Sequence, residues 1–347
     1  MRLWLFAIAA LILLMTIVGG ATRLTESGLS ITQWKPIAGV VPPLSDADWQ
    51  AEFDGYKQIP QFKVMRPDMA LPEFKTIFWW EWAHRLLARI IGLAFIVPAL
   101  AFWIGGRLKG ETGRWVLLAC GFLALEPIVG WWMVSSGLSE RVEVAPQRLA
   151  VHLLIAAAVY AALLAAAAMP GDAVSDRVAA TAAPLTKGGA DAPYAIRDRV
   201  YRRLGALLAL LVFAQLGLGA LAAGLRAGLI DNTWPLMEGA LIPGSAFPGP
   251  SPLAAMAQDP TTAQFDHRMM AYLIAAVALA LAVRALAADG MDAGKRRRAL
   301  TVAALALVQG VLGVATLLLR VPIALGLAHQ ALAMALLGAA VWNWRRG

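Results

Sequence analysis

Eight long apolar segments constrain the fold of this chain more than any other feature. They cover residues 3–22, 79–104, 114–134, 149–169, 201–223, 266–288, 299–319 and 322–344. A helix needs about 20 apolar residues to cross the hydrocarbon core of a bilayer. Inside lipid, only helices and closed barrels satisfy their own backbone hydrogen bonds. The chain is 60% hydrophobic and 15% charged, far from the composition of soluble domains. We therefore expect an all-α polytopic membrane protein with eight transmembrane helices.

The basic residues predict how these helices are oriented. Lysine and arginine gather at the chain start, in every second connection and after the last span: Arg2, Arg107, Lys109, Arg114, Lys187, Arg197, Arg199, Arg202, Arg203, residues 295–298, Arg345 and Arg346. Because positive loops stay inside, both termini are expected in the cytoplasm of a bacterial inner membrane. The net charge of +8 comes from these loops and does not indicate nucleic-acid binding. The first segment also resembles a signal peptide, but the internal repeat requires a span there.

The two halves of the sequence repeat. Gly28-Leu29, Trp34, Gly39 and Pro43 recur 200 residues later, His84-Arg85 and Gly130 recur after 183, and His152 recurs after 177. Each half holds four spans, so both halves have the same orientation, and a pseudo-twofold axis would run along the membrane normal. We predict a four-helix bundle over 1–170, with an outer loop at 23–78 that forms short helices on the membrane surface. A cytoplasmic linker would cover 171–198, and a second four-helix bundle 199–347.

The only four histidines of the chain lie near the outer ends of alternate spans. They are His84, His152, His267 and His329. Coordinating side chains are costly at membrane depth and usually functional, and two facing imidazoles hold six-coordinate haem iron. The residue four positions after each histidine is alanine, which leaves room on the same helix face for a flat ligand. The alternatives are structural histidines, or zinc or copper, which usually recruit carboxylate or thiolate as well. The single cysteine, Cys120, excludes an internal disulfide or a thiolate cluster.

Glu81 distinguishes the two halves. It shares a helix face with His84, whereas the equivalent residue of the second half is Gln264. A buried carboxylate can take up a proton or stabilise positive charge, so the first half is the candidate for chemistry. The alternative is that Glu81 only pairs with Arg85 or an interfacial tryptophan. A second difference, Glu126-Pro127 against Gln309-Gly310, predicts a kink in the third span.

Arginines next to the histidines could bind acidic groups of a ligand. Arg85 and Arg268 each follow a histidine directly, and arginine binds a carboxylate such as a haem propionate through two hydrogen bonds. The alternative is that these arginines only position the helices at the headgroups.

Taken together, several motifs make the chain similar to the haem A synthases of alphaproteobacteria and mitochondria, over essentially its whole length. The motifs that carry this similarity are residues 20–30, 81–85, 131–138, 265–268 and 327–330. The resemblance implies an oxidoreductase that converts the C8 methyl group of haem O to a formyl group, giving haem A for terminal oxidases. It implies that His267 and His329 ligate a haem B cofactor and that His84 and His152 bind the substrate. Glu81 would match the catalytic glutamate. Some relatives carry outer cysteine pairs, which this chain lacks.

An electron carrier and a transporter are the two alternative classes of protein. A di-haem b-type electron carrier that oxidises quinol would normally place its haems on opposite sides of the membrane, whereas both histidine pairs here lie near the periplasmic side. A transporter would carry polar residues near the bilayer midplane, and the spans carry few. A complex with haem O synthase would protect a reactive intermediate, and assembly into homo-oligomers is left open by the sequence.

Overall fold

The computed structural model describes residues 1–169, 192–249 and 251–347 of the chain. Within them, eight helices are long and apolar enough to cross a membrane, which confirms the eight predicted spans. They are α1 (Arg2–Leu24), α4 (Leu71–Ile104), α5 (Gly110–Ser135), α6 (Pro146–Ala168), α8 (Ala192–Gly224), α10 (Pro260–Ala287), α11 (Ala293–Leu318) and α12 (Ile323–Arg346). Shorter helices are η1 (Ala38–Val40), α2 (Asp46–Lys57), α3 (Pro60–Met65), η2 (Ala227–Leu229) and α9 (Pro252–Gln258). The described residues form no named strand, so the all-α class is confirmed.

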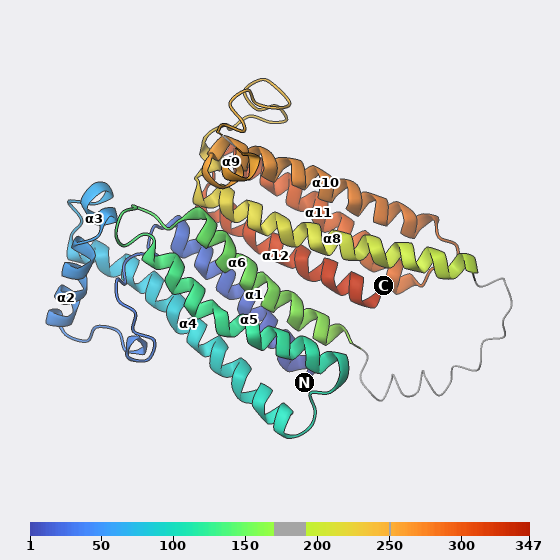
Figure 1. Ribbon diagram of the computed structural model, residues 1–347, viewed down its shortest axis with the longest axis horizontal. Coiled ribbons are helices and arrows are strands. Elements are labelled where there is room, and N and C mark those ends of the chain that lie inside the picture. Colours follow the sequence, from blue (N-terminus) through green and yellow to red (C-terminus); the bar gives the residue numbers. More distant parts are fainter. Residues whose placement is uncertain (170–191, 250) are drawn as a thin grey trace.

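The membrane helices lie in two groups of four (Figure 1). Helices α1, α4, α5 and α6 form one group, and α8, α10, α11 and α12 form the other. The pseudo-twofold axis that would relate the two groups stays a prediction. The domain boundaries stay predictions as well. Most of the predicted linker at 171–198 lies outside the described residues, and its last part, from Ala192 onward, already belongs to α8.

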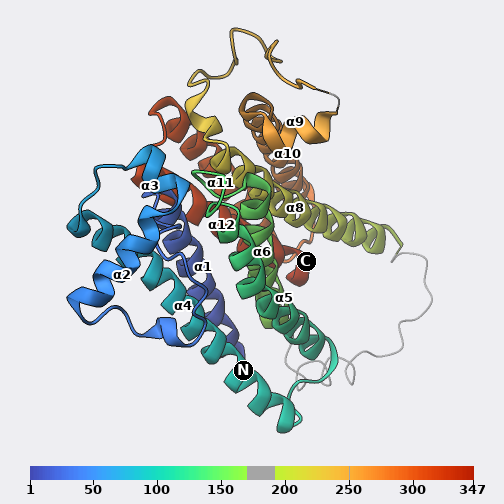
Figure 2. The ribbon, with the colours of Figure 1, turned by 60° about the vertical axis from the view of Figure 1, so that its left-hand side comes forward.

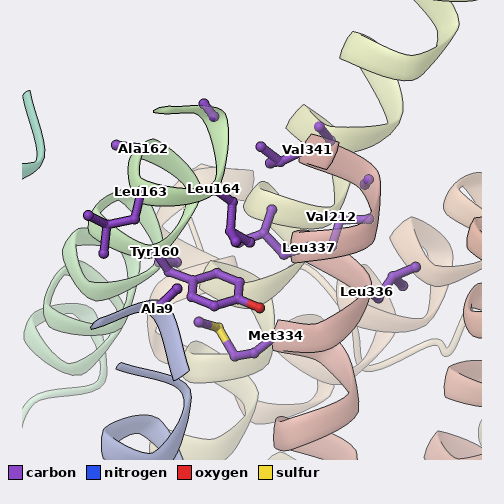
Figure 3. Packing of buried hydrophobic residues seen from close by; sticks show 14 of the residues in the cluster. Ala9, Tyr160, Ala162, Leu163, Leu164, Val212, Met334, Leu336, Leu337 and Val341 are labelled. Carbon is purple, nitrogen blue, oxygen red and sulfur yellow. The ribbon is translucent and has the colours of Figure 1, made fainter. Parts of the chain in front are cut away.

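The two groups share one apolar core, because α6 packs on α8 and α12 and α1 packs on α12. Figure 3 shows Leu164 of α6 facing Leu337 of α12, with Tyr160 beside Met334. The last part of α6 is mainly alanine, and small residues let membrane helices approach closely. At one close approach, a Cβ atom added to Gly338 of α12 would lie 2.6 Å from the hydroxyl of Tyr160. The halves are therefore packed as one body.

Helix α4 extends beyond the predicted span at its N-terminal end. It has 34 residues, which corresponds to a length of about 51 Å at 1.5 Å per residue, and it begins eight residues before the predicted span. Helices α2 and α3 lie beside its first turns (Figures 1 and 2). The buried rings of Trp49, Phe53, Tyr56, Phe74 and Phe78 form a small separate core there. The outer loop does form short helices as predicted, and they cover the extension of α4. His84 consequently lies in the middle of its helix rather than a few residues from its start.

Ion pairs link the two halves in the connections that follow α1, α5 and α8. Arg226 forms ion pairs with Glu26 and with Glu143. Glu143 also pairs with Arg23, whose Nη2 lies 2.9 Å from its Oε2. Glu26 and Arg226 occupy equivalent positions of the repeat, 200 residues apart, and both adopt left-handed backbone conformations, with φ of 56° and 51°. Arg66 of the outer loop binds Glu26 at 3.0 Å. Loops from both halves are thus held together next to the helix ends that carry the histidines.

Candidate functional site

The four histidines come from helices that lie diagonally in their groups. Helix α1 packs on both α4 and α6, which carry His84 and His152, and α8 and α11 each pack on both α10 and α12, which carry His267 and His329. The rings of His267 and His329 lie 6.3 Å apart, centroid to centroid, at an angle of 69°. His84 and His152 are close enough for a charge on one to act on the other. Each predicted pair is therefore brought together inside one group of helices.

A glycine on the preceding membrane helix supports each imidazole. A Cβ atom added to Gly19, Gly130, Gly219 or Gly313 would lie 3.0, 3.2, 3.2 or 2.8 Å from the Cε1 atom of His84, His152, His267 or His329, respectively. Ordinary contacts of this kind begin at 3.4 Å, so any larger residue would push the ring away. This support is not among the sequence predictions, although Gly19 and Gly219 lie at the repeat offset of 200 and Gly130 and Gly313 at 183.

The second half offers unpartnered donors beside its histidine pair. Nδ1 of His267 is buried without a hydrogen bond, and so are Nε and Nη1 of Arg268. The remaining Nη2 of Arg268 donates to the backbone oxygen of Asp231 at 3.2 Å. Buried donors without partners are rare in proteins, and these suit an acidic ligand that lies between imidazoles. In the described part of the chain, no three His, Cys, Asp or Glu side chains gather as a metal cluster, so the donor set fits a haem, which brings four nitrogens of its own, better than a bare ion.

In the first half, Glu81 is held by a closed set of contacts. It is 3% exposed. Its Oε2 accepts hydrogen bonds from the hydroxyl of Ser30 at 2.8 Å and the backbone N–H of Ile31 at 2.7 Å. Its Oε1 accepts from Nε and Nη2 of Arg85 at 3.0 and 2.5 Å. The pairing with Arg85 is the alternative that the sequence raised, and the carboxylate is turned toward the outer loop.

The equivalent residues of the second half keep part of this scaffold. Arg85 donates to the backbone oxygen of Ile31 at 2.8 Å, as Arg268 does to that of Asp231, and these two acceptors are again 200 residues apart. Gln264 also donates to the oxygen of Asp231, at 2.8 Å, and does not hold Arg268. Arg268 therefore keeps free donors. All three nitrogens of Arg85 donate to Glu81 or to backbone oxygens, so the structure favours Arg268 over Arg85 for binding an acidic group.

A second carboxylate approaches the first histidine pair. Oε2 of Glu126, on α5, lies 2.6 Å from Nδ1 of His152. At the equivalent place in the second half, Nε2 of Gln309 lies 3.2 Å from Nδ1 of His329. The exchange of Glu126 for Gln309 is visible in the sequence, but the only prediction drawn from these residues is a kink at Pro127. Helix α5 continues through Pro127 to Ser135, and the predicted kink stays a prediction.

The fold and the site define a class of protein: a helical membrane protein with a histidine pair inside each of two four-helix groups. Residues 2–341 match the COX15-CtaA family, described as cytochrome oxidase assembly protein, and the chain belongs to this family.

Several curated proteins are similar over nearly their full length. The heme A synthase of Rhodopseudomonas palustris (strain BisA53) is 49% identical, over 97% of this chain and 88% of the relative. That of Chelativorans sp. (strain BNC1) is 45% identical, over 99% and 90%. That of Azorhizobium caulinodans (strain ATCC 43989 and equivalents) is 48% identical, over 95% and 88%. The resemblance inferred from the motifs is thereby confirmed.

Proposed function

We propose that this protein is a haem A synthase, an oxidoreductase that converts the C8 methyl group of haem O to a formyl group. Membership of the family and the name shared by its relatives support this function. The observation that carries it is the difference between two otherwise matching sites. Each half brings two histidines together, but only the first half places carboxylates, Glu81 and Glu126, where the second half has amides.

We assign the second half to a resident haem B. His267 and His329 would ligate its iron, and the free donors of Arg268 would bind a propionate. When bound, this group supplies one-electron transfer. Gly219 and Gly313 support the two imidazoles, as Gly19 and Gly130 do in the first half, so the free donors of Arg268 are what distinguish this site.

We assign the first half to the substrate. Haem O would bind between His84 and His152, with its farnesyl tail in lipid or an apolar groove. Successive two-electron oxidations of the methyl group would give the alcohol and then a hydrated aldehyde, which loses water. Glu81 would accept protons or stabilise positive charge near the reacting carbon. Its burial and its ion pair with Arg85 would hold the carboxylate in one place.

The environment follows from the same assignment. The protein would lie in the bacterial inner membrane with both termini in the cytoplasm and the haem sites near the periplasmic face. Its proposed partners are haem O and the lipid bilayer. We also propose a complex with haem O synthase and, separately, assembly into homo-oligomers. His152, His267 and His329 lie six or seven residues from the first residue of their helices. In the proposed orientation these helix starts would all face the same side, which does not favour an electron carrier with haems on opposite sides.

The experiment that tests this function replaces Glu81 by glutamine, which copies Gln264. We expect Glu81→Gln to bind haem O but to form no haem A, as measured by extraction and chromatography of the haems. The matched control is Ser30→Ala, which removes one hydrogen bond to the same carboxylate and should keep most of the haem A yield. A normal haem A yield from Glu81→Gln would refute the role of Glu81.

A further inference from the structure

Glu126 has no structural task in the described structure other than its approach to His152. Its side chain is 15% exposed, and its Oε2 lies 2.6 Å from Nδ1 of His152. Its Oε1 is buried with no hydrogen-bond partner. Glu81, in contrast, has both oxygens saturated by Ser30, Ile31 and Arg85. Of the two carboxylates near the first histidine pair, Glu126 is thus the one that faces a candidate ligand directly.

The contact is close but not yet aligned as a hydrogen bond. Nδ1 of His152 makes no hydrogen bond of acceptable geometry in the structure, although the oxygen is near enough for one. The ring rests with its Cε1 edge on Gly130, one turn after Glu126 on the same helix. A small rotation of the imidazole on this support would point its N–H at the carboxylate. Helix α5 therefore provides both the support for the ring and the acceptor for its proton.

The second half places an amide in the same position. Gln309 lies 183 residues after Glu126, and Gly313 lies 183 residues after Gly130. Nε2 of Gln309 lies 3.2 Å from Nδ1 of His329 and donates to the backbone oxygen of the same residue at 3.0 Å. Each histidine ligand candidate on α6 and α12 thus has a polar partner on the preceding helix. The partner can carry a full negative charge in the first half only.

The charge of that partner matters to a bound iron. An imidazole that coordinates through one nitrogen donates the N–H of the other, and the acceptor fixes the tautomer and the basicity of the ligand. Whereas the amide of Gln309 presents its nitrogen, a donor, to the imidazole, a carboxylate can accept that proton in a hydrogen bond with an ionised partner, which is stronger than one between neutral groups. The ring then donates more electron density to the metal, and hydrogen bonding of this kind is one of the levers that set a haem potential.

We propose that Glu126 is a positioning residue that orients His152 and lowers the reduction potential of the haem bound in the first half. Gln309 leaves the haem of the second half at a higher potential. The inference rests on the proposed function insofar as His152 and His329 are taken to ligate haems. A lower potential in the substrate site would favour the ferric state there and make loss of electrons from the substrate haem easier.

The test exchanges the two partners. The full-length protein is purified with both haems from cells that supply haem O, and each haem is titrated potentiometrically. We expect Glu126→Gln to raise the potential of the first-half haem so that its ferric-to-ferrous ratio falls at least tenfold at a given potential, which is 59 mV for one electron. Gln309→Glu should lower the potential of the other haem by a similar factor. Glu126→Asp, which keeps the charge, should restore part of the wild-type value.

The outcomes separate this inference from the proposed function. Shifts of opposite sign in Glu126→Gln and Gln309→Glu, each confined to its own half, support the tuning. If both variants keep their haems and both haems titrate as in the wild type, the tuning is refuted while the function stands. A wild-type protein that holds no haem would overturn both.

Discussion

Gly313 offers the sharpest test of how the fold positions a candidate haem ligand. Replacement by alanine would place a Cβ atom 2.8 Å from Cε1 of His329, against the 3.4 Å at which ordinary contacts begin. The ring would have to retreat by about 0.6 Å, a displacement of the kind that costs about 1–3 kcal/mol in a packed interior. Alanine gains about 1 kcal/mol over glycine in a helix, so the free energy of unfolding should fall by roughly 0–2 kcal/mol.

The effect on haem binding should be larger than the effect on stability. Binding sites must hold their ligands within about 0.5 Å of the productive geometry, and displacement of a supporting group costs about 10–100-fold in metal affinity. We expect purified Gly313→Ala to lose most of its haem B and its low-spin absorption spectrum, measured as the ratio of haem to protein.

Gly310 provides the control on the same helix. It lies three residues before Gly313, and an added Cβ atom there would meet nothing within 4 Å. Gly310→Ala should therefore keep the full haem content and be at least as stable as the wild type. If Gly313→Ala binds haem as well as Gly310→Ala does, the glycine does not support a ligand and the reasoning fails.

Three further predictions concern the ligands and the outer ion pairs. His267→Ala should abolish bound haem B while His84→Ala keeps it and loses haem O instead; extraction of the haems decides this, and equal loss in both variants would contradict the division of roles. Arg226→Gln should lower the stability by only about 1 kcal/mol or less, because the side chain is 42% exposed and surface pairs contribute little; a loss of several kcal/mol in thermal unfolding would show a larger role for this link. Burial raises the pKa of Glu26, but hydrogen bonds from Arg226 and Arg66 outweigh it and hold the pKa below 4.5. The stability from this group is thus complete above pH 4.5 and is lost as the pH falls through the lowered pKa, so the melting temperature should fall more in acid for the wild type than for Glu26→Gln.

The sequence predicted most of the fold, because hydropathy and helix length are nearly decisive for membrane spans. Helix α4 begins eight residues before the predicted span 79–104. Residues 71–78 mix charges with aromatic rings, and their helix is stabilised by packing on α2 and α3, a contact that no local pattern reveals. Helix α8 likewise begins at Ala192, within the predicted linker, while the boundaries of the linker stay predictions.

The sequence predicts which residues belong to the candidate site. It does not predict the contacts that these residues make. The repeat identified the four histidines and the exchange of Glu81 for Gln264. The repeat could not show that Glu81 binds Arg85 while Arg268 keeps free donors. This difference depends on how the carboxylate of Glu81 and the amide of Gln264 are oriented in the fold. The approach of Glu126 to His152 was hidden in the same way, since it depends on how α5 packs against α6.

The most direct test of the central claim is the identity and number of the haems in the purified protein, made in cells with and without haem O. The account predicts one haem B per chain in both cases, and haem O, the hydroxylated intermediate or haem A only when haem O is supplied. Two haem B per chain with no dependence on haem O would contradict the division into a cofactor half and a substrate half, and the absence of any haem would contradict the assignment of the histidines as ligands.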